Sequence, residues 1–244
     1  MKKLLINTLL LVIVIGTFSR CKKSSGASNQ TNNSCPITAV DRQSITDTIH
    51  WTFTYDGQNR LVSNRQINSL SGIPEEMTFQ YGTGYLITTF VVQGTGYEDS
   101  LVLNSNGSVN TDYHIATNST YFTRYAYSSD NELLQTTTTV PSNNESFTTV
   151  YTWANGDMIA SSDGFTYTYD STKKTQTGDW WQTQQYIQYG DGAWTIKNTH
   201  LQTGSNYTNG TPLKYTYDYD SKGRITSVAY GSQATQLYTY ACGD

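Results

Sequence analysis

The stretch KYTYDYDSKGRITSVAY, residues 214–230, decides the fold, because a looser copy, HWTFTYDGQNRLVSNR, occupies residues 50–65. In both copies aromatic residues alternate with Thr or Asp until a short Asp-x-x-Gly-Arg or Asp-x-x-Asn-Arg segment interrupts the alternation. Alternation with a period of two indicates a strand with one buried face, and a polar interruption carrying Gly or Asn is typical of a turn. Each copy therefore predicts a β-hairpin.

The spacing inside these copies recurs along the chain. An aromatic or aliphatic anchor is followed six residues later by an aliphatic or β-branched residue. The anchors are Tyr55, Tyr81, Leu103, Tyr127, Trp153, Tyr169, Tyr189 and Tyr219, and the following residues are Leu61, Ile87, Val109, Leu133, Ile159, Thr175, Thr195 and Ile225. If both residues face the same side, they enclose one cross-strand pair and a three-residue loop, whose last position favours positive φ. Gly, Asn or Asp holds that position in five of the eight copies, namely Asn59, Gly107, Asn131, Asp157 and Gly223.

The composition agrees with a chain of hairpins. The sequence has 20 Tyr and 19 Gly, is rich in Thr, and is poor in the residues that favour helices. A lone hairpin is marginal in water, so the units must join into one sheet. Because one face of that sheet is aromatic, it must curl, fold into a sandwich or close into a barrel. We predict an all-β fold of consecutive antiparallel hairpins in one large curled meander sheet, with its closure left open.

Residues 1–20 have the features of a secretory signal peptide. Lys2 and Lys3 precede an apolar run that is shorter than the roughly 20 residues of a spanning helix. The end of this run resembles a bacterial lipobox but departs from it at Arg20, so we expect cleavage and lipidation at Cys21, with a cleaved soluble protein as the alternative. The polar residues 21–34 predict a flexible tether, and residues 35–244 the hairpin domain.

The net charge and the positions of the cysteines limit which partners and cross-links we expect. Loss of residues 1–20 removes Lys2, Lys3 and Arg20 and no acids, so the formal charge changes from −4 to −7. Nucleic-acid binding needs clustered Lys and Arg, and we expect none. Cys35 and Cys242 lie at the two ends of the hairpin domain in an exported chain. They form either a disulfide or two buried thiols.

The two stretches YDYDSKGRITSVAY and FTYDGQNRLVSN resemble the YD repeats of Rhs-type proteins, whose pattern reads Tyr-Asp, two variable residues, Gly-Arg-Leu. Small secreted bacterial lipoproteins with degenerate repeats of this kind are similar in size and layout. Residues 55–61 and 219–225 match the pattern well, and looser similarity covers about residues 50–240. The resemblance implies long sheets of β-hairpins. In Rhs proteins such sheets wrap a cargo polypeptide, but this chain has too few hairpins for a closed shell, so only the fold is expected to carry over.

One segment lies outside the repeat: TGDWWQTQQY, residues 177–186. On a strand, the adjacent Trp180 and Trp181 would point to opposite faces, so one would face outward. An exposed Trp amid amides and hydroxyls is typical of a sugar-binding surface. The alternative is that both rings are buried by the curl of the sheet or by an adjacent loop.

The sequence offers little for catalysis. His50, His114 and His200 are isolated, and no nucleophile or phosphate-loop motif is present. We expect no catalytic residues, no metal and no cofactor. The predicted function is that of a non-catalytic envelope lipoprotein with a structural or interaction role, held at the outer membrane by its lipid on a face left open, with a glycan or envelope protein as partner. The alternative is a carbohydrate-binding lipoprotein that uses an outward Trp of residues 177–186.

Overall fold

The computed structural model describes residues 35–116, 119–190, 193–208 and 210–242, all within Thr31–Asp244, one of the two units into which the chain divides. The predicted signal peptide, Cys21 and the tether at residues 1–34 lie outside the described residues. Within these described ranges, no helix is long and apolar enough to cross a membrane.

The described residues form sixteen strands and one helix. The strands are β1 (Ile37–Ser44), β2 (Thr48–Tyr55), β3 (Leu61–Asn68), β4 (Pro74–Gly82), β5 (Tyr85–Val92), β6 (Thr95–Leu103), β7 (Val109–Ala116), β8 (Ser119–Tyr127), β9 (Leu133–Val140), β10 (Glu145–Ala154), β11 (Asp157–Ser161), β12 (Phe165–Lys174), β13 (His200–Tyr207), β14 (Leu213–Tyr219), β15 (Ile225–Tyr230) and β16 (Ala234–Tyr240). The helix, α1 (Trp180–Tyr189), lies between β12 and β13 in the sequence.

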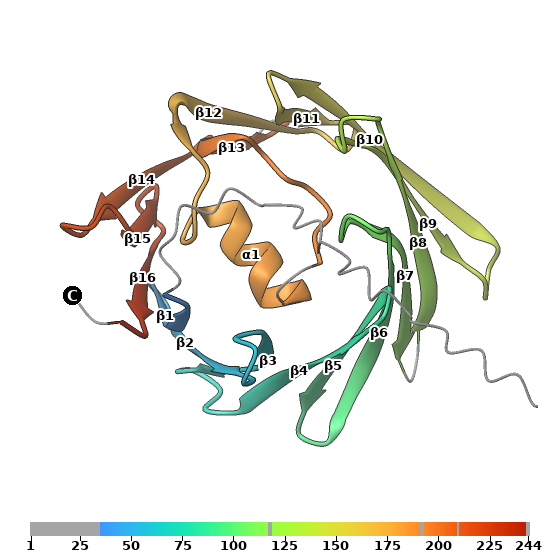
Figure 1. Ribbon diagram of the computed structural model, residues 1–244, viewed down its shortest axis with the longest axis horizontal. Helices are drawn as coiled ribbons and strands as arrows, with labels where there is room; N and C mark the ends of the chain where they lie inside the picture. The colour runs from blue at the N-terminus through green and yellow to red at the C-terminus, as the bar shows by residue number, and fades with distance from the viewer. Residues whose placement is uncertain (1–34, 117–118, 191–192, 209, 243–244) are drawn as a thin grey trace, which may run out of the picture. The chain divides into compact units, whose positions relative to one another are not determined.

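The sheet closes into a barrel (Figure 1). Each strand pairs antiparallel with its neighbours in sequence, and β1 pairs with β16, where Val40 lies opposite Tyr238. The prediction of an all-β chain of consecutive hairpins is confirmed, and the closure that the sequence left open is that of a sixteen-strand barrel. Closure buries the aromatic face and pairs the edges of the sheet.

The six-residue spacing is confirmed in four hairpins. Each has the predicted pair across its turn, with a register shift beside the anchor: Tyr55 and Leu61, Leu103 and Val109, Tyr127 and Leu133, Tyr219 and Ile225. The last loop residues have positive φ: Asn59, Gly107, Asn131 and Gly223. These are bulged three-residue turns, as the spacing predicted.

The turn at residues 220–224 shows how its side chains stabilise it. Asp220 Oδ1 accepts hydrogen bonds from the backbone N–H groups of Lys222 and Arg224, both at 2.9 Å. Arg224 Nε donates to Asp220 Oδ2 at 2.5 Å, and the guanidinium lies 4.9 Å from the ring centre of Tyr240. This ion pair is buried, because Arg224 packs against the barrel with only 7% of its surface exposed.

Four copies of the repeat depart from the predicted spacing. Tyr81 pairs with Leu86, and Trp153 pairs with Met158 across Asn155–Gly156. Asn155 and Gly156 both have positive φ, which is the two-residue turn that matches the twist of paired strands. The copies that begin at Tyr169 and Tyr189 form no hairpin, because the chain leaves the sheet after β12 and enters α1.

Helix α1 lies inside the ring of strands (Figure 1). Asp179 caps its N-terminus by accepting hydrogen bonds from the backbone N–H groups of Trp181 and Gln182, at 2.9 and 3.1 Å. At the other end Gly190 has a φ of 69°, and a Cβ there would lie 2.7 Å from the hydroxyl of Tyr81. The helix therefore ends where only glycine fits between it and the barrel wall.

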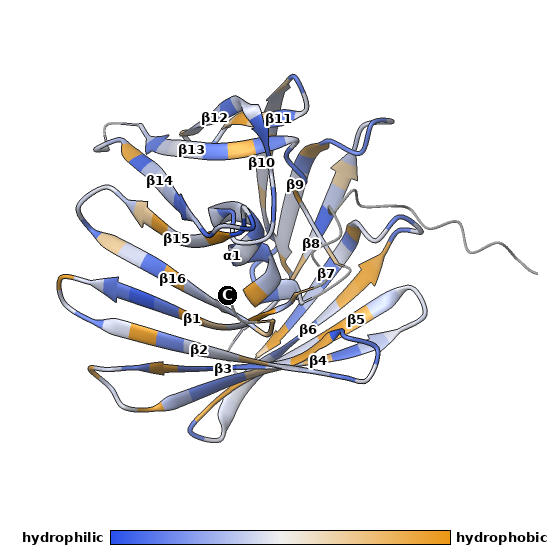
Figure 2. Ribbon diagram, turned by 60° about the vertical axis from the view of Figure 1, so that its left-hand side comes forward, coloured by the Kyte–Doolittle hydropathy of each residue, from blue (hydrophilic) through white to orange (hydrophobic). Residues whose placement is uncertain are grey.

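Apolar and polar residues alternate along many of the strands (Figure 2). In β2, Trp51 and Phe53 are buried inside the barrel, while the alternating residues Thr48, His50 and Thr52 are exposed. The main core cluster joins inward residues of β1–β7 and β13–β16 to Tyr189 of α1. Packing against α1 thus fills one side of the lumen with side chains.

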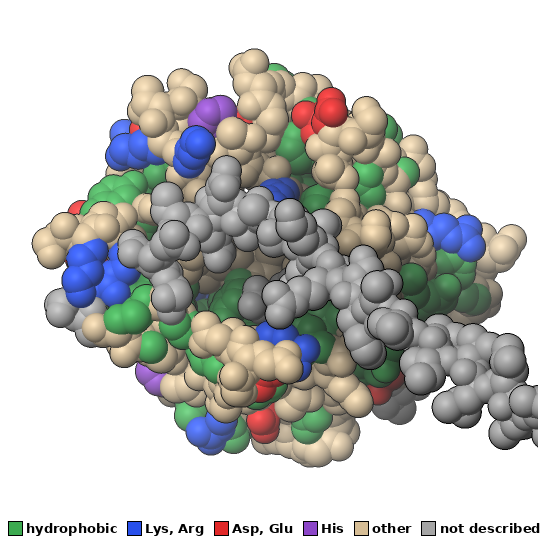
Figure 3. All heavy atoms as spheres, in the orientation of Figure 1, with side chains coloured by type: hydrophobic (Ala, Val, Ile, Leu, Met, Phe, Trp, Pro, Cys, Tyr) green, Lys and Arg blue, Asp and Glu red, His purple; other side chains and the backbone are tan. Residues whose placement is uncertain are grey.

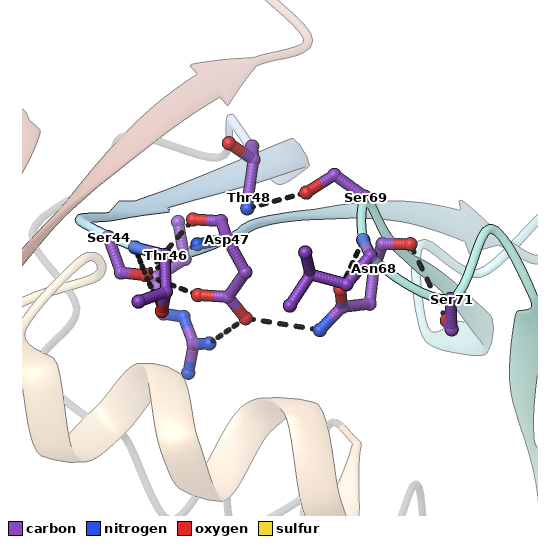
Figure 4. A network of polar contacts seen from close by, with 9 residues as sticks. Ser44, Thr46, Asp47, Thr48, Asn68, Ser69 and Ser71 are labelled. Carbon is purple, nitrogen blue, oxygen red and sulfur yellow. Dashed lines mark hydrogen bonds and ion pairs between the residues drawn. The ribbon is translucent and has the colours of Figure 1, made fainter.

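Neighbouring turns and strands are joined at both rims of the barrel. Cys35 and Cys242 form a disulfide next to the seam between β1 and β16, with Cα atoms 5.7 Å apart. At the opposite rim, shown in Figure 4, Asp47 of the β1–β2 turn accepts hydrogen bonds from Arg42 at 2.9 Å and Asn68 at 3.1 Å. The hydrogen bond from Ser44, above all, lowers the pKa of Asp47.

Candidate ligand-binding cavity

A cavity of about 780 Å³ lies in the lumen between α1 and the wall from β7 to β14. Its lining combines Tyr and Trp rings with the amides of Gln residues and the hydroxyls of Thr and Ser residues. It extends from α1 to Asp163 in the turn between β11 and β12. Its volume is within the range of sites that bind small molecules, which is roughly 300–1,000 Å³.

Asp179 fixes α1 relative to this cavity. Besides capping the helix, its Oδ2 accepts a hydrogen bond from the backbone N–H of Gln202 in β13, at 3.1 Å. Asp179 is 2% exposed, and burial raises the pKa of its carboxyl to about 6, although its hydrogen bonds act in the opposite direction. One side chain thus sets the distance between the helix and the β13 wall.

Trp180 and Trp181 both line the cavity, and the prediction that they lie on a strand with one ring facing outward is wrong. On the helix their side chains diverge by about 100° rather than 180°. The ring of Trp180 stacks 5.7 Å from that of Tyr215, and the ring of Trp181 packs edge-on 5.9 Å from that of Tyr167. The two indoles therefore form part of the inner lining instead of an outer surface.

Three lining residues carry buried polar atoms without a hydrogen-bond partner among the residues that the structure describes. These atoms are the carboxylate oxygen Oδ1 of Asp112, the indole nitrogen Nε1 of Trp181 and the amide oxygen Oε1 of Gln202. A buried polar atom without a partner costs roughly 1–3 kcal/mol. These two acceptors and one donor come from β7, α1 and β13, and a ligand in the cavity that is rich in hydroxyl groups could satisfy them.

The wall formed by β6, β7 and β8 carries a polar cluster. Asp99 and His114 are each 9% exposed, and His114 Nδ1 lies 2.6 Å from Asp99 Oδ1. The His114 ring lies between those of Tyr97 and Tyr121, with centroids at 4.7 and 4.4 Å. Burial raises the pKa of Asp99, and the hydrogen bond from His114 partly offsets this effect.

The other two histidines also pair with aspartates. His50 Nδ1 lies 2.6 Å from Asp41 on the outer wall, and His200 Nδ1 lies 2.6 Å from Asp157. In the part of the chain that the structure describes, no group of three or more His, Cys, Asp or Glu residues could hold a metal ion. The histidines therefore act here as partners of carboxylates.

Asp112 and Asp99 were not predicted as site residues, although the sequence contains a signal for them. Asp99 lies two residues before Leu101 and four before the anchor Leu103, and so on the inward face of its strand. Asp112 lies opposite Leu101 in the neighbouring strand. A carboxylate in phase with buried aliphatic residues is unusual and could have identified this wall.

Comparison with known proteins is informative about the fold. No family model and no curated protein matches this chain. A crystal structure of a porin-like protein from Bacteroides uniformis ATCC 8492 is similar, with a TM-score of 0.59, 15% identity, and coverage of 84% of this chain and 96% of that one. At 15% identity, this similarity shows a shared barrel fold alone.

These comparisons correct the predicted resemblance to YD repeats of Rhs-type proteins, which is wrong. The barrel resembles a porin-like protein, and the YD-like phrases recur because the same bulged turn closes several of its hairpins. The residues shared by these stretches are explained by their roles in the turn. The Asp accepts hydrogen bonds from turn N–H groups, the Gly or Asn adopts positive φ, and the Arg packs on a Tyr ring.

Proposed function

We propose that this protein is a non-catalytic binding protein of the bacterial envelope that takes a saccharide into the lumen of its barrel. The observation that carries the proposal is the cavity lining, in which indole and phenol rings stand beside amides and unpartnered polar atoms. Flat aromatic rings cover the C–H faces of sugars, and amides and carboxylates bind their hydroxyl groups. A purely structural role, which is the other candidate, gives these polar atoms no partner.

The polar residues on the outer wall support the proposal that the barrel is surrounded by water. Membrane-spanning barrels present an outward apolar band flanked by aromatic girdles. Here the outward residues of β4 include Glu76, Thr78 and Gln80, all exposed. Exposed apolar residues occur on many strands, such as Val102 on β6 and Tyr113 on β7, but the outward residues of β2 are Thr and His. Charged side chains are also scattered over the end of the barrel seen in Figure 3. This polarity suits attachment to a membrane better than insertion into one.

Attachment through Cys21 would hold such a barrel at the outer membrane. The signal-like residues 1–20 and the polar residues 21–34 are the basis for this part of the proposal. Labelling with a radioactive fatty acid in a bacterial host should mark the wild-type chain and leave a Cys21→Ala chain unmarked. Equal labelling of both chains would contradict lipidation at this residue.

Binding is tested by titrating the purified protein with panels of oligosaccharides and polysaccharides. We expect saturable binding of at least one glycan. Trp181→Phe keeps a ring in place but removes the unpartnered N–H, and Gln184→Ala removes a lining amide for which the structure records no hydrogen bond. Together they should weaken binding by about tenfold or more.

Trp194→Phe is the matched control. It also removes an indole N–H, but Trp194 lies against the β6–β7 turn, where its Nε1 donates to Asn106, and it does not line the cavity. This variant should bind glycans like the wild type. Absence of binding to every glycan, or equal binding by the cavity variant, would refute the saccharide proposal and favour the structural role.

A further inference from the structure

Asp112 is the feature of the cavity that ordinary sugar hydroxyls explain least well. It projects inward from β7, is 8% exposed, and lines the cavity. Its Oδ1 has no hydrogen-bond partner among the residues that the structure describes. The six ion pairs recorded for those residues do not include it.

The groups around Asp112 supply no compensating charge. On β6, Asp99 is itself acidic, and its partner His114 on β7 has its Nδ1 directed to Asp99 rather than to Asp112. The facing groups on the other elements are phenols, namely Tyr97 of β6, Tyr121 and Tyr125 of β8, and Tyr189 of α1. Burial raises the pKa of each of these phenols, so they stay neutral through the physiological range.

The pKa of the Asp112 carboxyl reflects this lack of a counter-charge. Burial, and secondarily the charge of Asp99, raise the pKa of Asp112 from its ordinary value of 3.8 to about 7. A hydroxyl donor would satisfy Oδ1 but leave the ionised carboxylate buried without a counter-charge. A cation would supply both the hydrogen bond and the charge, and the surrounding phenol rings favour cations near their faces.

We propose that Asp112 binds a primary ammonium group, so that the ligand of the lumen is an amine-bearing saccharide rather than a neutral one. This inference rests on the proposed function, because it assigns one subsite of the same cavity. The aromatic and amide lining would hold the sugar rings, and Asp112 would select the amine.

The test compares a glucosamine trisaccharide with the same trisaccharide fully N-acetylated, by calorimetric titration of the purified protein. N-acetylation removes the charge and keeps the sugar rings. We expect the amine form to bind about tenfold more tightly near pH 7, as a charge-assisted hydrogen bond would give. The preference should fall below about pH 6, where Asp112 is protonated, and above about pH 9, where the amine is neutral.

Asp112→Asn should abolish both the preference and its pH dependence. Asp130→Asn is the control, because Asp130 is an exposed carboxylate in the turn between β8 and β9 and does not line the cavity. It should keep the preference, which excludes a general effect of negative charge. Thermal melting of both variants establishes that each is folded at the temperature of titration.

The outcomes separate the two proposals. Equal binding of both trisaccharides by the wild type, weakened by Trp181→Phe with Gln184→Ala, would overturn the amine subsite and leave the saccharide proposal standing. A preference that survives in Asp112→Asn would also overturn the subsite. Absence of binding to both trisaccharides and to the wider glycan panel would overturn both proposals.

Discussion

The hydroxyl of Tyr240, in β16, donates a 2.7 Å hydrogen bond to the backbone carbonyl of Ile225, which is the first residue of β15. The same link joins Tyr81 to Leu61 at 2.8 Å and the indole N–H of Trp153 to Leu133 at 2.7 Å. Each acceptor follows a bulged three-residue turn, where the ladder is interrupted. Tyr or Trp suits these positions of the repeat, because the ring fills the core and its O–H or N–H group donates a hydrogen bond to the backbone carbonyl that follows the neighbouring turn.

Tyr240→Phe tests this link. The substitution keeps the ring and leaves the carbonyl of Ile225, a fully buried residue, without its donor. We expect a loss of roughly 1–2 kcal/mol in the free energy of unfolding, measured by urea denaturation. Tyr207→Phe is the control, because Tyr207 is 51% exposed and no hydrogen bond of its hydroxyl is recorded. An equal effect in both variants would assign the loss to the ring environment instead of the hydroxyl.

Gly223→Ala tests the turn conformation. Gly223 has a φ of 78°, and an added Cβ would have nothing within 4 Å, so the cost arises from the backbone alone. We expect roughly 1–2 kcal/mol of destabilisation in thermal or urea unfolding. Gly57→Ala, in the equivalent loop of the β2–β3 hairpin, also meets nothing within 4 Å but lacks positive φ, and should change stability by less than about 0.5 kcal/mol. Unchanged stability of Gly223→Ala would refute the left-handed turn.

Paired replacement of Cys35 and Cys242 by Ser tests the contribution of the disulfide. The bond encloses residues 207 apart in sequence, and the chain-entropy account gives such a loop roughly 4–5 kcal/mol. We expect a lower melting temperature for the variant, and reductant should lower that of the wild type but not that of the variant. Mass spectrometry without reductant should find a peptide pair linked through these cysteines. Two free thiols in the exported protein would contradict it.

Asp112→Asn should raise stability in a pH-dependent way. Because the folded-state pKa of about 7 exceeds the ordinary 3.8, the folded state loses stability as pH rises between these values, and the full penalty applies above about 7. The penalty is at most roughly 4 kcal/mol. The variant should therefore be more stable than the wild type at about pH 8 and similar at about pH 3.5. A constant difference across this range would assign the effect to packing.

Local patterns predicted six of the eight hairpins, four of them with the correct turn length, because strand alternation and turn preference depend on neighbouring residues. The pair Tyr219 and Ile225 could be placed from six-residue spacing alone. The spacing does not distinguish a three-residue loop from the two-residue turn at Asn155–Gly156, so the register beside Trp153 was wrong by one residue. Closure depends on pairing between Val40 and Tyr238, which no local pattern records.

The cavity could not be predicted because it depends on the position of α1. Residues 180–189 contain Gln, Thr, Trp and Tyr, which suit a strand as well as a helix, and the deciding signal is Asp179 as an N-cap. Even with the helix assigned, the contact of Asp179 with Gln202 that orients it toward β13 joins residues distant in sequence. The sequence singled out Trp180 and Trp181 as lying outside the repeat, but their place in the lumen follows from the position of α1.

The seam between β1 and β16 has a consequence for the way the barrel assembles. Every other strand pairing joins neighbours in the chain, so hairpins can form and extend one after another with little loss of chain freedom. The seam alone brings together segments at opposite ends of the described sequence, so its pairing carries the largest loop-closure cost in the barrel. Without this pairing β1 and β16 would be exposed edges, and the disulfide beside them lowers the entropic cost of bringing them together.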